Sequence, residues 1–536
     1  MPATAADLAL VNGRVRTLDP ERPAASAVAV TAGRIVAVGD AVDVRPLIGP
    51  ATEAIDLGGA AVVPGLIDGH VHALPGAISM GSLDLSDAQT LDDVRTRLAD
   101  ERARCEPGGW IVGWGLDQRV FAETGIHGKL IEEAAGGLPV LLRFADFHTA
   151  LASPRALALA GVAGPRTFAE HAEIVCVDGV PTGELREAAA TMLVQGAAPA
   201  PTASERRATA VENMRRLAAT GITAAHLMDG DPSSLDMLRD LEAGGDLRVR
   251  CVVPMWIKPE MERDEWEALA AHRDARGRRW RAGVVKLFMD GVVDSGTAWL
   301  DEPDADGAGT DPFWPDPARY REAVAFFSGR GFQCATHACG DRAVHEVLNA
   351  YRDAPRAAGV RHRIEHVELL RAEDLPRFAA EGVIASMQAQ HMTVLEPDGG
   401  DGWSRRVGPQ RWGRAYRARD LYESGAWLVL GSDWPVVRHD PREGMAAARL
   451  RRPPGRRDRA PWDDQALTAL QALQGYTTWA ARAVGHDDQG RIAPGCLGDL
   501  TVLARDPVDC DADDLLDDPV LLTVVDGEVT HRDPSL

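Results

Sequence analysis

Between residues 61 and 485, short apolar runs rich in Val, Ile and Leu alternate with longer stretches rich in Ala, Leu, Arg and Glu. Such runs are typical of buried strands, and the longer stretches have the composition of covering helices. The alternation predicts an α/β fold built from strand–helix units around a parallel sheet. Eight runs qualify as strands, the number that a (β/α)8 TIM-type barrel needs. They are residues 61–72, 222–227, 248–255, 283–289, 332–337, 362–367, 383–388 and 428–433.

The long interval after the first predicted strand departs from this pattern. Residues 75–215 are too many for a barrel loop, and they contain two further strand-like runs, 110–114 and 139–144. Connections of this length without structure of their own are uncommon in compact domains. We therefore predict a long insertion after barrel strand 1.

Both chain ends are also rich in β-like runs. These are residues 8–12, 28–31, 35–38, 500–504 and 521–525. The last run is followed by Asp526-Gly527, a typical two-residue hairpin turn. We predict that residues 1–60 and 486–536 together build one small β-sandwich-like domain, beside a barrel of residues 61–485 that carries the insertion.

The composition limits the partners that the chain can have. Its 536 residues are 45% hydrophobic and 26% charged, and no apolar stretch approaches the ~20 residues that span a membrane. The formal net charge of -22 argues against binding to nucleic acid or to an anionic membrane. The seven cysteines include no CxxC pair, which argues against a disulfide framework or a structural zinc site. The first residues lack the features of a secretory signal, so we expect a cytoplasmic protein.

The first predicted strand ends in His70-Val71-His72, which carries the first candidate chemistry. Residues i and i+2 of a strand face the same side, so both imidazoles can bind one ion at ~2.0–2.1 Å. The preceding Gly69 allows a close approach, and Asp68 could be a partner for an imidazole. Two histidines also occur at this spacing by chance, so the pair alone leaves a metal site and coincidence as alternatives.

Lys286 interrupts the otherwise apolar run 283–289. Burying an ammonium group is costly unless it is paired or deprotonated. A deprotonated amine could take up carbon dioxide and become a carbamate, which is a carboxylate able to bridge two cations. The alternative is an ordinary lysine paired with Asp290 or Asp294.

Three further side chains end predicted strands. His337 and His366 close the fifth and sixth strands, and Asp433 closes the eighth. Each has a structural alternative, because histidines at such places are commonly hydrogen-bonded and aspartates commonly cap helices. Together with the histidine pair and the lysine, however, they occupy the C-terminal ends of strands 1, 4, 5, 6 and 8. Barrel enzymes build their active sites at these ends.

The motifs that hold these residues resemble the amidohydrolase superfamily. PGLIDGHVH, Lys286, His337, His366 and GSDWP carry the likeness to the superfamily. VKLFMDG, THACGDRAV, HRIEH and GSDWPV are most similar to its YtcJ-like, or amidohydrolase-3, branch, which includes N-substituted formamide deformylases. The likeness extends to the closing segment GRIAPGCLGDL and so covers nearly the whole chain.

The resemblance implies a role for each candidate residue. The histidine pair would bind one metal ion, and Lys286, carboxylated on its side-chain nitrogen, would bridge it to a second ion held by His337 and His366. Asp433 would be both a metal ligand and the general acid/base. The expected cofactor is a divalent metal, one or two ions, with zinc favoured. A metal-bound hydroxide would be the nucleophile.

The insertion supplies candidates for contact with the substrate. Its segments GWGLD and FHTALAS resemble recurring segments of the YtcJ-like branch and could fold over the barrel mouth as a lid. Trp114, Asp117 and His148 are the candidate substrate-binding residues, and His148 is also a candidate catalytic group that stabilises the carbonyl oxygen. Aromatic packing within the insertion is the alternative for Trp114 and His148. Glu187 is a weaker candidate, because a glutamate on a polar helix face is usually solvated.

The predicted function is hydrolysis of a non-peptide C–N bond, in the amide of an N-formyl or N-acyl amine, by metal-bound hydroxide. Hydrolysis of a cyclic amide, a lactone or an ester by the same site is an alternative. Deamination is disfavoured, because His337 is followed by Ala-Cys-Gly-Asp and not closely by a glutamate. A non-catalytic scaffold is an alternative of another class, although every ligand position is filled. The expected partners are a small-molecule substrate and further copies of the chain, with a dimer favoured.

Overall fold

The computed structural model describes residues 5–74, 83–106, 108–396 and 398–536. Its centre is a barrel-forming sheet of eight parallel strands. The strands are β8 (Leu66–Val71), β15 (Ile222–Leu227), β16 (Arg250–Trp256), β17 (Trp280–Phe288), β18 (Gln333–Ala338), β19 (Arg363–His366), β20 (Ile384–Met387) and β21 (Trp427–Leu430). They pair in the order β21-β20-β19-β18-β17-β16-β15-β8. The predicted TIM-type barrel is confirmed.

Backbone hydrogen bonds connect the segments at the C-terminal ends of the first and last barrel strands. His72 N donates a hydrogen bond to Trp434 O over 2.9 Å, and Asp433 N donates to His70 O over 2.7 Å. These backbone bonds place the histidine pair beside Asp433, although nearly the whole barrel sequence separates them.

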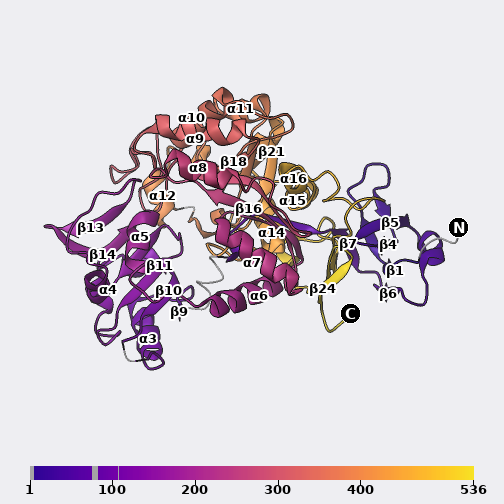
Figure 1. Cartoon of the computed structure of the whole chain (residues 1–536), viewed down its shortest axis with the longest axis horizontal. Coiled ribbons are helices and arrows are strands. Elements are labelled where there is room, and N and C mark those ends of the chain that lie inside the picture. Colours follow the sequence, from indigo (N-terminus) through magenta and orange to yellow (C-terminus); the bar gives the residue numbers. More distant parts are fainter. Residues whose placement is uncertain (1–4, 75–82, 107, 397) are drawn as a thin grey trace.

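The two chain ends build a pair of sheets at one end of the molecule (Figure 1). Their strands are β1 (Leu8–Val11), β2 (Arg14–Arg16), β3 (Ala24–Ala25), β4 (Ala27–Thr31), β5 (Arg34–Gly39), β6 (Glu53–Asp56), β7 (Ala61–Pro64), β22 (Leu500–Leu503), β23 (Val520–Val525) and β24 (Glu528–Arg532). The sheet orders are β5-β4-β1-β6 and β24-β23-β22-β7-β2-β3, and side chains from both ends share one apolar core. The predicted hairpin is confirmed, with Asp526 and Gly527 both at positive φ.

The first predicted barrel strand is two strands in the structure. β7 pairs with β2 and β22 outside the barrel, and only β8 enters the barrel sheet. Both strands are fully buried. The apolar run 61–72 therefore continues across the boundary between two sheets, and its composition does not mark that boundary.

The insertion lies at the other end of the molecule from the N-terminal sheet (Figure 1). Its strands are β9 (Leu83–Asp84), β10 (Ile111–Leu116), β11 (Val140–Phe144), β12 (Thr149–Ala152), β13 (Glu173–Val177) and β14 (Val180–Arg186), in the order β13-β14-β12-β11-β10-β9. Its helices are α3 (Leu91–Arg102), α4 (Pro154–Leu159) and α5 (Glu187–Gln195). The strands predicted at 110–114 and 139–144 are confirmed as β10 and β11. Residues 75–82 of the predicted insertion lie outside the described ranges.

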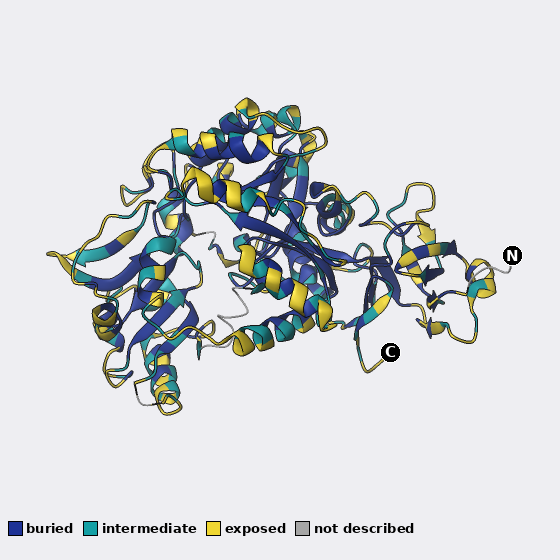
Figure 2. Cartoon of the chain, in the orientation of Figure 1, coloured by how far each residue is buried: buried dark blue, intermediate teal, exposed yellow. Residues whose placement is uncertain are grey.

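Further helices surround the barrel, with buried inner faces and exposed outer faces (Figure 2). They are α6 (Ala203–Ala219), α7 (Pro232–Ala243), α8 (Arg263–Ala270), α9 (Pro317–Gly329), α10 (Asp341–Asp353), α11 (Leu375–Glu381), α12 (Gly402–Val407), α13 (Ala418–Glu423), α14 (Pro441–Leu450), α15 (Ala469–Gly475) and α16 (Thr478–Ala483). A short helix, α1 (Ala41–Val44), belongs to the N-terminal sheet. Within the described ranges, no helix combines the length and apolar character needed to cross a membrane.

Candidate metal centre

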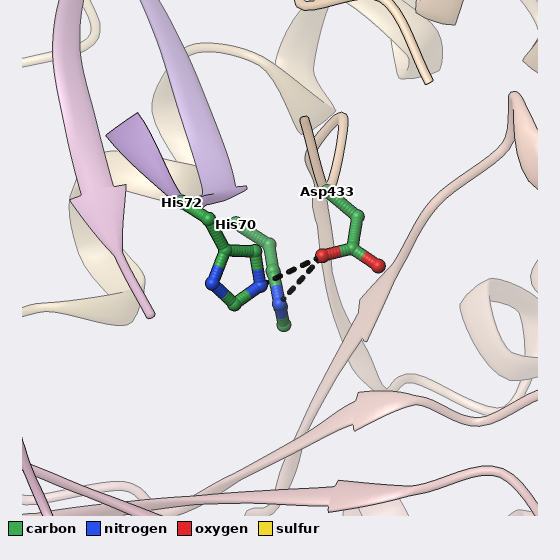
Figure 3. Close-up of side chains that lie close together, drawn as sticks. All are labelled: His70, His72 and Asp433. Atoms are coloured by element: carbon green, nitrogen blue, oxygen red, sulfur yellow. Dashed lines mark ion pairs between the residues drawn. The ribbon is translucent and has the colours of Figure 1, made fainter. Parts of the chain in front are cut away.

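His70, His72 and Asp433 meet at the mouth of the barrel (Figure 3). His70 Nε2 lies 3.3 Å and His72 Nε2 lies 2.9 Å from Asp433 Oδ1. The imidazoles come from the end of β8, where residues i and i+2 face the same side, and the carboxylate follows β21. One ligand atom from each residue lies within 4.8 Å of the other two. A single ion could therefore contact all three side chains.

Glycines and a buried aspartate hold these two segments close together. A Cβ added to Gly69 would lie 2.6 Å from a backbone oxygen of β21, and one added to Gly431 would lie 2.4 Å from His70 N. Asp68 accepts hydrogen bonds from His70 N at 3.1 Å and from Ser432 N and Oγ at 3.0 and 2.6 Å. Asp68 therefore holds the backbone of the two segments together. It was expected to bond to an imidazole ring, and the structure shows no such bond among the described residues.

Carboxylates behind the imidazoles fix the position of their protons. His70 Nδ1 donates to Glu365 Oε2 over 2.7 Å, and His72 Nδ1 donates to Asp229. With the proton held at Nδ1, His70 Nε2 presents its lone pair to the centre of the cluster. At His72, Asp229 outweighs the effect of burial and raises the pKa to about 10. Burial alone would raise the pKa of Glu365, but Arg363 and His70 outweigh it and hold that pKa well below its usual value. Glu365 is therefore a permanent hydrogen-bond acceptor.

Lone pairs consequently face one another at the centre of the cluster. His70 Nε2 and Asp433 Oδ1 are buried and have no hydrogen-bond partner among the described residues. A buried polar atom without a partner costs about 1–3 kcal/mol, and two acceptor atoms at 3.3 Å also repel each other. A divalent cation would remove both costs, and imidazole and carboxylate are donors that zinc accepts. The cluster therefore fits a divalent metal ion.

Lys286, in β17, is only 1% exposed and lines a cavity beside the cluster. No described carboxylate lies within 4.0 Å of its Nζ, so the expected alternative of a pair with Asp290 or Asp294 is not formed. Asp290 instead accepts three backbone N–H groups. Burial lowers the pKa of Lys286, and nearby carboxylates, Glu365 first, only partly oppose this shift. A lowered pKa favours the deprotonated amine that carbamate formation requires.

A second set of donors uses the other oxygen of Asp433. His366 Nδ1 lies 3.8 Å and His391 Nε2 lies 3.6 Å from Asp433 Oδ2. The His337 ring is 4.3 Å from that of His366, but its Nε2 is bonded to Gly291 O at 3.0 Å. Burial lowers the pKa of His337 and His366 well below the usual value, so both rings are neutral, as metal ligands must be. The described geometry thus groups His366 with His391 and Asp433.

Several residues of the site have left-handed backbone conformations. The φ angles of His366, Asp433 and Glu187 are 75°, 61° and 67°. Such conformations cost about 1–3 kcal/mol in residues other than glycine, and they cluster at functional sites. The fold therefore maintains strained backbone at the two donor sets and at the insertion residue that faces them.

The insertion contributes a hydrogen-bonded pair to the barrel mouth. His148 follows β11 and Glu187 begins α5, and His148 Nδ1 donates to Glu187 Oε2 over 2.7 Å. Glu187 N in turn donates to His148 O over 2.7 Å. Burial alone would lower the pKa of His148, but Glu187 outweighs burial and raises it. Glu187 is 1% exposed, so the expectation that it is solvated is wrong.

Two cavities, of about 240 and 540 Å³, meet at the donor clusters. Both are lined by His148, His337, His366 and Asp433. Asp117 lines the larger cavity. Trp114 lines neither; it is 8% exposed within the inserted sheet, as the packing alternative expects. The insertion therefore lines the site through His148 and Asp117, and not through Trp114.

The model of one known protein family matches most of the chain. The model of the amidohydrolase family matches residues 53–531, a range that includes the barrel and both donor sets. The chain belongs to the amidohydrolase family. It is therefore a hydrolase, and its donor clusters fit the metal dependence that the resemblance implies.

Three similar proteins extend this result. The N-substituted formamide deformylase of Arthrobacter pascens is 28% identical over 98% of each chain. The YtcJ protein of Bacillus subtilis (strain 168) is 28% identical over 97% of this chain and 98% of its own. A solved uncharacterized metal-dependent hydrolase of Pyrococcus horikoshii has a TM-score of 0.75 and 24% identity, covering 94% of this chain and 99% of its own. The predicted likeness to the YtcJ-like branch is confirmed.

The sequence patterns did not point to three residues of this amidohydrolase site. Glu365 is part of the HRIEH motif but precedes the histidine that ends the strand, so its contact across the barrel was not apparent. Asp229 follows β15 by two residues, and a search of every strand end for carboxylates would have found it. His391 begins a short 3-10 helix after β20, and no periodic pattern marks that helix.

Proposed function

We propose that this amidohydrolase hydrolyses a non-peptide C–N bond, in the amide of an N-formyl or N-acyl amine, with a divalent metal ion, zinc by preference. The observation that supports this most is the convergence of unpartnered His70 Nε2 and Asp433 Oδ1 at a cavity large enough for a small molecule. The likeness to an N-substituted formamide deformylase supports an amide as the substrate.

His70, His72 and Asp433 would hold the first ion, and His366 and His391 offer donors for a second. A bound divalent cation supplies Lewis acidity, which polarises a carbonyl group and makes water a stronger acid. The carboxylation of Lys286 remains a prediction, supported by its buried and unpaired amine.

Asp433 would carry the proton of the reaction. A carboxylate offers about four lone-pair sites on two oxygens, so Asp433 can bind an ion and still accept a proton from the attacking water. It would then deliver that proton to the departing nitrogen, which leaves as an amine. General acid–base catalysis of this kind typically contributes about 10²–10⁴-fold in rate.

His148 would stabilise the carbonyl oxygen. Its Nδ1 proton is committed to Glu187 at 2.7 Å, and the raised pKa favours a second proton on Nε2. That N–H can donate to an oxygen on which negative charge develops. Phe288 and Phe313, with ring centroids 5.4 Å apart, line the same cavity and would exclude water from the reacting bond.

A substrate screen of the zinc-loaded protein tests the proposal. The panel contains N-formyl amines, N-acyl amines, lactams and lactones, and the readout is release of amine or acid. We expect turnover of an N-formyl or N-acyl amine and its loss in Asp433→Asn. Turnover of lactones or lactams alone would replace the proposed substrate class. A protein that binds metal and hydrolyses none of these compounds would contradict the proposal.

A further inference from the structure

Two cationic side chains line the smaller cavity without a carboxylate partner. Arg143 comes from β11 and Lys258 follows β16. No described carboxylate lies within 4.0 Å of either side-chain cation. The residues outside the described ranges contain no Asp or Glu. No other part of the chain can therefore supply the missing carboxylate.

Cationic side chains in this chain have many carboxylates available as partners. Carboxylates are in excess, with 80 acidic and 58 basic residues. Arg250, for example, pairs with both Asp499 at 2.7 Å and Asp526 at 3.0 Å. The sequence contains only three lysines, Lys129, Lys258 and Lys286, and the last two both line this cavity. Arg143, Lys258 and Lys286 therefore bring three basic side chains to one cavity, and none of them has a described carboxylate within 4.0 Å.

The acidic side chains of the same cavity are already used, apart from Asp433 of the metal centre. Their bonds are Glu187 to His148, Asp229 to His72, Glu170 to the backbone N of Ala189, and Asp146 to Thr149. Asp229 and Asp146 act on Arg143, and Glu170 and Lys258 act on each other, only at longer range. Neither cation therefore has a direct carboxylate partner in the cavity.

Both cations lie beside the reacting centre. Arg143 Nη1 donates to Phe147 O at 3.4 Å, next to His148, and Nη2 donates to Gln195 Oε1 at 2.6 Å. Lys258 follows Ile257, whose N donates to the backbone oxygen of Lys286 over 3.0 Å. The insertion and the barrel thus each supply one cation to the cavity that contains the candidate centre.

We propose that Arg143 and Lys258 bind a carboxylate of the substrate, so that the hydrolysed amide carries an anionic group. This inference rests on the proposed function. A guanidinium can bind a carboxylate through two parallel hydrogen bonds, and an ammonium adds a compact charge. Trp256 and Phe288, with ring centroids 5.2 Å apart, line the same cavity and would contact an apolar substituent.

N-formyl and N-acyl derivatives of aromatic amino acids combine these features. Hydrolysis adds water across the C–N bond. The carbonyl carbon gains the water oxygen, the nitrogen gains a proton, and the products are a carboxylic acid and a free amino acid. Neither an oxidant nor a further reactant is needed.

Three related amides test the inference on the full metal-loaded chain. N-formyl-phenylalanine carries the carboxylate on the amine side, and N-succinyl-2-phenylethylamine carries it on the acyl side. N-formyl-2-phenylethylamine has no carboxylate. We expect one of the two anionic amides to exceed the neutral one in kcat/KM by about tenfold or more, because a charged hydrogen-bonded group is recognised. The preferred one shows which side of the amide faces the cations.

Variants then test whether the cations cause this preference. Lys258→Met and Arg143→Gln should each lower the ratio of kcat/KM between the anionic and neutral amides by about tenfold, mainly through KM, because binding of a remote group is lost. Lys129→Met is the matched control, since Lys129 is exposed and lines neither cavity, and it should keep the wild-type ratio.

The possible outcomes are distinguishable. A wild-type preference for the neutral amide would overturn the inference without any variant, and so would an unchanged ratio in Lys258→Met. In both cases the proposed amide hydrolysis would stand. Failure of all three amides at full metal loading would instead contradict the proposed function, and the inference with it.

Discussion

Two buried carboxylates lie at opposite ends of the barrel, and they differ in their partners. Asp499, at the end where the strands begin, accepts hydrogen bonds from Arg250 Nε at 2.7 Å, Gln489 Nε2 at 3.0 Å and Asp526 N at 2.7 Å. Asp433, at the mouth, has an Oδ1 atom without a hydrogen-bond partner among the described residues. The exposed fractions are similar, 4% and 6%. Burial is thus similar at both ends, but only Asp499 accepts hydrogen bonds from described residues at both of its oxygens.

The buried cations repeat this contrast. Arg250 pairs with two carboxylates at the start of the barrel, whereas Lys286 at the mouth pairs with no described carboxylate. A satisfied buried network stabilises a fold, and a buried group without a partner costs stability. We therefore expect the residues with partners to stabilise the barrel, and the residues without partners to bind a metal ion or a substrate.

The largest effect on activity is expected from Asp433→Asn. The change removes a metal ligand and the proton carrier, so kcat/KM should fall by about 10³-fold or more. The free energy of unfolding of the chelator-treated protein should fall by less than in Asp499→Ala, because Asp433 Oδ1 has no hydrogen-bond partner among the described residues. Kinetics and urea unfolding measure the two effects. Strong destabilisation without metal would show that Asp433 is a structural carboxylate like Asp499.

The next largest effect is expected from Lys286→Ala. If Lys286 carries a carbamate that contacts the ions, activity should fall by roughly 10²–10³-fold and bound metal should fall with it. A short carboxylic acid should restore part of the activity. Lys129→Ala is the control, because this lysine is exposed and lines neither cavity. Full retention of metal and activity in Lys286→Ala would make Lys286 an ordinary buried residue.

Asp499→Ala should show the opposite behaviour. Removing one partner of a buried ion pair costs about 3 kcal/mol or more, and Arg250 would keep only Asp526. The free energy of unfolding should therefore fall, while kcat/KM per folded molecule changes less than about threefold. Urea unfolding with activity measured well below the transition tests this. A large loss of kcat/KM in the folded variant would weaken the separation between the two ends.

Glu187→Gln should lower kcat/KM by about 10²-fold, the smallest loss expected for a residue at the mouth, because His148 would lose its anionic partner. Glu187 opposes the effect of burial on the pKa of His148. Without that charge the pKa falls, and the protonated imidazole is lost at a lower pH. The alkaline limb of the kcat/KM profile should therefore move to lower pH. An unmoved limb would exclude His148 as the group that titrates.

The sequence predicted the barrel and the strand ends well, because periodicity and composition report which face of a strand is buried. It located His70, His72, His366 and Asp433 at one mouth, since all four end barrel strands. It did not predict His391, whose Nε2 lies 3.6 Å from Asp433 Oδ2, because His391 is placed there by a short 3-10 helix that no periodic pattern marks. Pairing partners such as Glu365 and Asp229 depend on side-chain contacts between strands, which local patterns do not encode.

The metal-binding role of the mouth is tested most directly by calorimetric titration of zinc into the chelator-treated protein. The contrast between Asp433 and Asp499 predicts saturable, submicromolar binding of at least one equivalent, greatly weakened in Asp433→Asn and kept in Asp499→Ala at a temperature where that variant is folded. The absence of saturable binding to the wild-type chain, or equal binding by Asp433→Asn, would contradict a metal centre at the barrel mouth.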